Sequence, residues 1–128
     1  MVKMGTNGDV KIMAYKNAII FDFETTGLSS YSDQIIEVGL LNLEIIDGKF
    51  VATDELSCLV QTERPLPLKI IEITHITDEM LLREGITEKE AYEKIKKFYR
   101  PDTLLIAYNI NFDLSFLKAL FRKLQTLI

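Results

Sequence analysis

Residues 17–30 read NAIIFDFETTGLSS, and two carboxylates, Asp22 and Glu24, stand inside this otherwise apolar segment. The apolar, aromatic run is short and is followed by turn-forming residues, which predicts a buried strand that ends in a loop. Residues i and i+2 of a strand share a face, so the two carboxylates project together, opposite to Phe21 and Phe23. No cation lies near them in the sequence, so we expect a group from outside the chain to neutralise their charge.

The chemistry of these carboxylates has two interpretations. Hard oxygen ligands suit Mg²⁺ or Mn²⁺, and sites with two such ions cleave phosphodiesters. For an isolated Asp-x-Glu triplet the simpler interpretation is a strand end capped by Thr25, Thr26 and backbone amides. Asp113 is equally ambiguous, because it stands at the first turn of a predicted helix, where an anion complements the helix dipole. The residues alone leave both interpretations open.

Composition bounds the class of protein. The chain has 128 residues, of which 48% are hydrophobic and 27% charged, and this predicts one soluble globular domain. The formal charge of −4 argues only weakly against nucleic acid, because carboxylates that bind cations become positive sites once metallated. The single cysteine, Cys58, cannot form an internal disulfide, and neither a signal peptide nor a membrane-spanning run is visible. We therefore expect a cytoplasmic protein without a membrane anchor.

The pattern along the chain predicts a loosely held leader over residues 1–16 and one domain over residues 17–128. Hydrophobic periodicity, an Asp-Gly turn, a capping box and Pro101 delimit the elements of this domain. They are strands at 17–24, 34–46 and 49–60, two short helices broken near Thr74, a helix from 87 until Pro101, a strand at 103–108, and a helix at 112–128. A β-meander that feeds a strand–helix unit predicts an α/β domain of three layers.

Four segments of the chain carry a family resemblance. In order and wording, FDFETTGLSS, QIIEVG, ITHITDEML and AYNINFDLSFL resemble the DEDD exonucleases of the DnaQ type, which include the proofreading subunit of replicative polymerases. The resemblance runs from about Ala18 to about Leu120. It implies a ribonuclease H-like α/β/α fold whose mixed sheet joins an antiparallel meander to a parallel strand. It also implies metal-dependent removal of nucleotides from 3′ ends.

The resemblance assigns roles by position. Asp22 and Glu24 match the metal ligands of the first motif, and Asp113 matches the carboxylate of the second; the implied cofactor is a pair of Mg²⁺ or Mn²⁺ ions. The residues that match substrate-binding positions are Thr25, Thr26, Gly27 and Leu28, which hold and wedge the terminal nucleotide, and Asn109. The implied partners are single-stranded DNA 3′ ends and a DNA polymerase subunit.

The chain departs from the family pattern in two places. Tyr108 stands where relatives often have histidine, beside the second-motif ligand, and we expect this change to cost little. The family's third motif, a histidine base followed by a fourth carboxylate, has no counterpart before Ile128, which predicts a domain lacking its last strand and helix. His75 is the only histidine, and we expect it to face solvent or line a groove. Loss of a general base alone typically costs about 10²–10⁴-fold.

Three functions stay open on the sequence. The first is a 3′-to-5′ exonuclease on single-stranded DNA. The second is an exoribonuclease of the oligoribonuclease or ribonuclease T type, and contacts to the 2′-hydroxyl would distinguish it from the first. The third is an inactive remnant that binds metal, nucleic acid or a polymerase without cleaving. Apolar surface left uncovered by the absent element predicts self-association or contact with a partner. A metal-binding domain unrelated to nucleic acid would leave the ordered motifs to coincidence.

Overall fold

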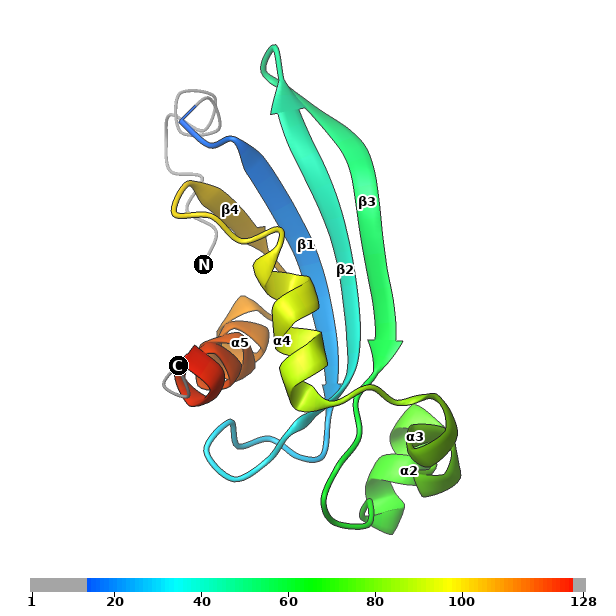
Figure 1. Cartoon of the computed structure of the whole chain (residues 1–128). Coiled ribbons are helices and arrows are strands. Elements are labelled where there is room, and N and C mark those ends of the chain that lie inside the picture. The colour runs from blue at the N-terminus through cyan, green and yellow to red at the C-terminus, as the bar shows by residue number, and fades with distance from the viewer. Residues whose placement is uncertain (1–13, 126–128) are drawn as a thin grey trace.

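The fold is built on a mixed four-stranded sheet, seen in a computed structural model that describes residues 14–125 (Figure 1). Strands β1 (Asn17–Thr25), β2 (Ile35–Ile46) and β3 (Lys49–Leu59) form an antiparallel meander, and β4 (Thr103–Ile106) pairs in parallel with β1. The spatial order is β3-β2-β1-β4. The predicted combination of a meander and a parallel strand is confirmed. Most of the predicted leader, residues 1–13, lies outside the described residues.

Local sequence explains how the strands are joined. Asp47 and Gly48 both have positive φ, at 53° and 75°, as a tight hairpin between β2 and β3 requires. The β1–β2 pairing is regular until a register shift between Glu24 and Thr25. Phe21 and Phe23 are buried on one face of β1, whereas Asp22 is exposed on the other, as the period of two predicts.

Within residues 14–125, three helices lie between the meander and β4, and one helix follows β4. They are α2 (Leu68–Thr74), α3 (Asp78–Glu84), α4 (Glu88–Lys96) and α5 (Ile110–Gln125). The break near Thr74 is confirmed, since His75 ends α2 in the left-handed conformation and Thr77 caps α3. The capping box of Thr87 and Glu90 starts α4, also as predicted.

The structure corrects three boundaries near the C-terminal half. α4 ends at Lys96 rather than at Pro101, because the next residues form tight turns in which Phe98 N–H donates to Ile95 O. β4 ends at Ile106 rather than at residue 108. α5 begins at Ile110, two residues earlier than predicted, because the Asn109 carbonyl already accepts the first amides of the helix. Residues 126–128 of the predicted closing helix lie outside the described residues.

The main core lies between the sheet and the helices α4 and α5. It combines Phe21 and Phe23 of β1 with Ile95 of α4 and Phe116 and Leu120 of α5. A smaller cluster packs α2 and α3 against the end of the sheet, where Figure 1 shows these two helices. Residues 14–125 thus supply a sheet layer and one helical layer, and the second helical layer of the predicted three-layer domain is not among these residues. Within the same residues, no helix is long and apolar enough to cross a membrane.

Candidate active site

The candidate site forms where two parallel strands end at one edge of the sheet. The last pair of the β1–β4 ladder is Ile20 with Ile106, but β1 continues to Thr25. Asp22 and Glu24 therefore lie on a length of β1 that β4 no longer covers. The chain turns just beyond β4 and enters α5 at Ile110, so the first turn of α5 falls next to this part of β1.

The Asp113 carboxylate lies beside the part of β1 that β4 does not pair with. Its Oδ1 accepts a hydrogen bond of 3.1 Å from the Phe23 N–H, across 90 positions of sequence. Its own N–H donates to the Asn109 carbonyl at 3.1 Å, so the side chain sits in the first turn of α5. Asp113 is buried, with 3% of its surface exposed. One hydrogen bond thus joins the second motif to the strand that carries the first.

The predicted carboxylates share one electrostatic environment. Burial raises the pKa of Glu24, and the nearby carboxylates of Asp22, Glu37 and Asp113 raise it further. Burial also raises the pKa of Asp113; the Phe23 N–H partly offsets this, and Asp22 adds to it. The structure therefore brings Asp22, Glu24 and Asp113 within electrostatic reach of one another.

Glu37 is a member of this group that the sequence motifs did not single out. It lies directly opposite Glu24 in the β1–β2 ladder, and opposite residues of an antiparallel pair share a face. The sequence shows both glutamates, but an uninterrupted hairpin that continued the Thr25–Ile35 pair would place Glu24 opposite Ile36. The observed register depends on the irregularity between Glu24 and Thr25, which no local pattern reveals.

The donor set fits a hard divalent cation. Asp22, Glu24 and Glu37 make no ion pair and no side-chain hydrogen bond with any other residue in the range 14–125. Neighbouring carboxylates repel one another when no protein cation neutralises them. Their oxygens are the type of ligand that Mg²⁺ and Mn²⁺ prefer, so a bound cation would relieve the repulsion. In that same range, no three acidic, histidine or cysteine side chains are already gathered as a formed metal site. Cation binding would therefore require these carboxylates to turn toward a common point.

The loop after β1 is held closed by Asp33. Its Oδ1 accepts from Thr26 Oγ1 at 3.1 Å, and its Oδ2 accepts from the Ser29 N–H at 3.0 Å. A Cβ at Gly27 would collide with the same carboxylate, so only glycine allows this close approach. Asp33 organises the predicted nucleotide-holding loop, and sequence reasoning missed it. Leu28 projects from the tip of the loop and is 88% exposed.

The remaining predicted residues also lie around the end of β1. Thr25 is buried, and its Oγ1 donates to the Gly27 carbonyl at 2.6 Å. Asn109 and Tyr108 are exposed on the connection between β4 and α5. His75, which we expected at a surface, is exposed at the end of α2. It is not among the groups that shift the pKa of Glu24 or Asp113.

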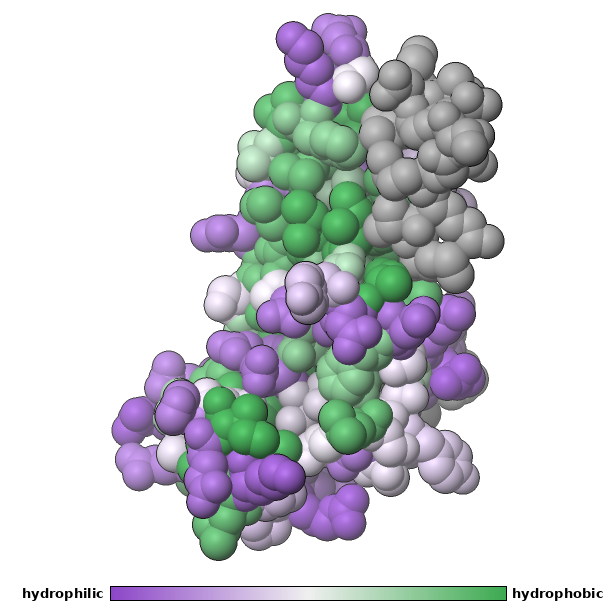
Figure 2. Space-filling model, turned by 180° about the vertical axis from the view of Figure 1, so that it is seen from behind, coloured by the Kyte–Doolittle hydropathy of each residue, from purple (hydrophilic) through white to green (hydrophobic). Residues whose placement is uncertain are grey.

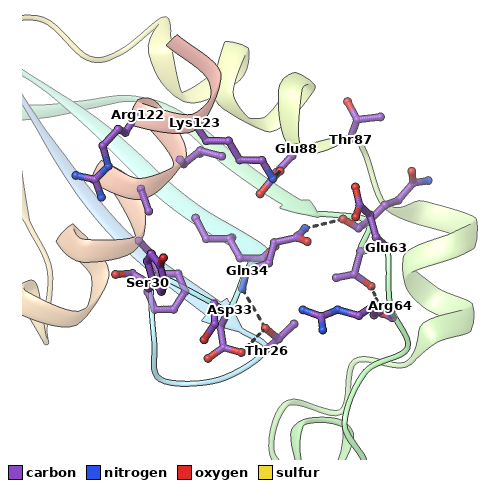
Figure 3. Close-up of a pocket in the computed structure, with 18 of the residues that line it drawn as sticks. Thr26, Ser30, Asp33, Gln34, Glu63, Arg64, Thr87, Glu88, Arg122 and Lys123 are labelled. Carbon is purple, nitrogen blue, oxygen red and sulfur yellow. Dashed lines mark hydrogen bonds and ion pairs between the residues drawn. The ribbon is translucent and has the colours of Figure 1, made fainter. Parts of the chain in front are cut away.

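A cleft of about 860 Å³ adjoins the Thr26 loop (Figure 3). Thr26, Asp33 and Gln34 line one side, and the C-terminal half of α5 lines another. On the α5 side of the cleft, Lys123 Nζ is 2.6 Å from Glu88 Oε1 of α4. None of the candidate metal ligands lines it. The cleft is therefore a neighbouring surface and not the carboxylate site.

The sequence pattern of the RNase T exonuclease family matches residues 19–127, which is most of the chain. The chain belongs to this exonuclease family. A PolC-type DNA polymerase III of Mycoplasma genitalium is 37% identical over 123 residues, which cover 95% of this chain and 8% of the relative. The PolC-type enzyme of Bacillus subtilis is 32% identical over 125 residues, covering 96% of this chain and 8% of the relative. The chain thus spans about one twelfth of the length of these relatives.

Solved structures show the same fold. Exonuclease I of E. coli, in complex with a dT13 oligonucleotide, matches 85% of this chain with a TM-score of 0.73 and 18% identity. The match covers 24% of that protein. Exonuclease I of Methylocaldum szegediense matches 84% of the chain with the same TM-score and 20% identity. The predicted ribonuclease H-like exonuclease fold is confirmed.

Proposed function

We propose that this domain is a metal-dependent 3′-to-5′ exonuclease that releases nucleotides from the 3′ ends of single-stranded DNA. The observation that carries the proposal is the hydrogen bond from Phe23 N–H to Asp113 Oδ1. This bond supports the proposal, because Phe23 stands between Asp22 and Glu24 in the sequence and Asp113 therefore lies next to that part of β1. Family membership and the PolC-type relatives support DNA as the substrate and a replicative polymerase as the context. We also propose a cytoplasmic location, since those relatives are DNA polymerases.

Asp22, Glu24 and Asp113 would hold the Mg²⁺ or Mn²⁺. When bound, these ions stabilise negative charge on the phosphate and favour the attacking form of water. The contribution of Asp113 is orientation, because the Phe23 N–H fixes one of its oxygens while the other stays available. Such fixed ligands need little rearrangement when charge develops on the substrate.

The loop after β1 would hold the terminal nucleotide. Thr26 is fixed by Asp33 and by the Gln34 N–H, so the loop has a defined shape before the substrate arrives. Gly27 lets the Asp33 carboxylate approach the loop closely, and the exposed Leu28 can wedge against a base. The exposed side chain of Asn109 lies at the start of α5, on the same segment as Asp113. Selectivity for DNA over RNA would follow from contacts that this loop makes with the sugar.

A second candidate is a domain that binds cations and nucleic acid and cleaves slowly or not at all. It is favoured by the position of His75, the only histidine of the chain, at the end of α2. A positioned general base contributes about 10²–10⁴-fold to a rate. Without a histidine beside the carboxylates among residues 14–125, turnover by this chain should be slow by roughly that factor.

The deciding experiment is release of mononucleotides from a 3′-end-labelled single-stranded DNA oligomer, with Mg²⁺ or Mn²⁺, by the chain and by Asp22→Asn. Glu55→Gln, which removes the same charge from an exposed position of β3, serves as the matched control. Cation-dependent release by the chain and by the control, lost in Asp22→Asn, supports the exonuclease. No release by the chain, together with cation binding that needs Asp22, supports the second candidate. A parallel RNA oligomer that is degraded faster than DNA would identify an exoribonuclease.

A further inference from the structure

The glutamates Glu24 and Glu37 form an unusual cross-strand pair. They lie directly opposite each other in the antiparallel ladder, so their Cβ atoms are about 4.5–5.5 Å apart and their side chains share a face. On the same face, Asp22 lies opposite Gly39, which has no side chain to cover it. The ladder therefore leaves three carboxylates on one small area of the sheet, with Gly39 as an opening between them.

Nothing in the surrounding sheet neutralises this pair. On its other side Glu37 faces Leu59 of β3, which is apolar. Neither glutamate forms an ion pair with another residue between positions 14 and 125. Like charges placed directly opposite one another destabilise a sheet, and threonine or lysine would serve stability better at either position. The pair makes physical sense if a bound cation offsets its repulsion.

We propose that Glu37 is a fourth acidic residue of the cation site, which positions Glu24 and adds its charge to the attraction for the metal. This inference rests on the proposed function, because it assigns a role at the same site. It adds a residue outside the ligand set of Asp22, Glu24 and Asp113. The negative charge of Glu37 has two effects: it attracts the cation, and it repels the Glu24 carboxylate. Repulsion by Glu37 disfavours Glu24 conformations that point back toward β2, so the Glu24 carboxylate is directed toward Asp22 and Asp113.

The raised pKa of Glu24 agrees with this geometry. Glu37 is among the carboxylates that raise it, together with Asp22 and Asp113 and after burial itself. The charge of Glu37 thus reaches the Glu24 carboxyl in the folded chain. The negative charge of Glu37, which repels the Glu24 carboxylate, attracts a divalent cation bound near Glu24.

The test is a Mn²⁺ titration of the whole chain, with free Mn²⁺ followed by electron paramagnetic resonance, on the wild type, Glu37→Gln, Glu37→Asp, Glu55→Gln and Asp22→Asn. Glu37→Gln keeps the shape and removes the charge, so Mn²⁺ should bind about tenfold more weakly, which corresponds to about 1.4 kcal/mol. Glu37→Asp keeps the charge and should stay within about threefold of wild type. Glu55→Gln, which lies on the same face opposite Leu41, should bind as the wild type does.

The outcomes separate this inference from the proposed function. Wild-type affinity in Glu37→Gln, with weakened binding in Asp22→Asn, would overturn the role of Glu37 alone. Equal affinity in the wild type and in Asp22→Asn would overturn the metal site itself. Glu37→Asp as weak as Glu37→Gln would overturn the charge-based assignment. Thermal unfolding without cation checks that each variant is folded. In that measurement the Tm of Glu37→Gln should exceed the Tm of the wild type, because the like-charge pair is gone.

Discussion

At the scale of single residues, Gly27 decides the shape of the loop after β1. Its missing Cβ makes room for the Asp33 carboxylate, which holds Thr26 and the Ser29 amide. Gly27→Ala would push Asp33 away and release this loop. A displacement of about 1 Å at a substrate-positioning group can cost about 10²-fold in rate. We expect nucleotide release by Gly27→Ala to fall by about that factor.

The measurement for Gly27→Ala is the rate of nucleotide release beside a Mn²⁺ titration. Cation binding should stay at the wild-type level, because the carboxylates lie on β1, β2 and α5 and not on the loop. Ser32→Ala is the matched control, since Ser32 is exposed on the same loop and its side chain makes no hydrogen bond with the other described residues. A wild-type rate in Gly27→Ala would show that the loop does not position the substrate.

Asp113 predicts a pH dependence of stability. Burial raises its folded-state pKa, so its protonated form is favoured in the folded chain. The stabilisation that comes from protonated Asp113 is fully present below the pKa of about 4 that the residue has in the unfolded chain. It is lost as the pH rises through the pKa that the residue has in the folded chain. The amide introduced by Asp113→Asn would stay neutral at every pH, and its oxygen could still accept the Phe23 N–H. In cation-free buffer at neutral pH, Asp113→Asn should therefore be more stable than the wild type.

Urea unfolding at a series of pH values measures this effect. The difference in unfolding free energy between Asp113→Asn and the wild type should shrink as the pH falls toward about 4. Saturating Mn²⁺ should reverse the order at neutral pH, because it would stabilise the wild type alone through this ligand. A variant that is less stable than the wild type at neutral pH without cation would contradict the dominance of burial at Asp113.

At the scale of elements, local signals predicted most of the helices and strands, whereas the contacts that complete the site could not be read from them. The meander, the Asp-Gly hairpin and the Thr87 capping box follow from local chemistry, and all three are present. The contacts that complete the site depend on where strands stop and how they align. Asp113 meets Phe23 because β4 ends early, and Glu37 meets Glu24 because of one register. Neither fact can be read from a single segment.

The helices α2 and α3 form a unit whose stability can be tested separately from the site. Thr77 Oγ1 accepts the Met80 N–H at 3.1 Å and caps α3, whose Leu81 packs in the smaller cluster. Thr77→Ala should lower the free energy of unfolding by about 1 kcal/mol, and Thr77→Ser should retain most of it. Chemical denaturation measures the loss. Mn²⁺ affinity should not change, and a weaker affinity would show that this unit helps to position Glu37 on the adjoining end of β2.

At the scale of the whole molecule, the sheet has two unlike faces. α4 and α5 cover one face, whereas the other shows apolar side chains over the strands (Figures 1 and 2). Ile20 is 40% exposed and Phe50 is 42% exposed, and both lie on this second face by the register of the ladders. Asp22 and Glu24 share that face with Ile20. A surface that carries both a charged site and an apolar area is suited to bind another macromolecule or a second copy.

We expect this apolar face to cause concentration-dependent self-association. In sedimentation velocity, the average sedimentation coefficient should rise with protein concentration, because pairing two such faces removes apolar area from water. Ile20→Lys combined with Phe50→Lys should weaken the association by about tenfold or more, since pairing would then bury unpaired charges. Leu82→Lys on α3, where the leucine is 81% exposed, is the control and should associate as the wild type does. A monomer at every concentration would contradict the expectation. The apolar face would then be assigned to binding of the substrate strand, and the double variant should alter that binding.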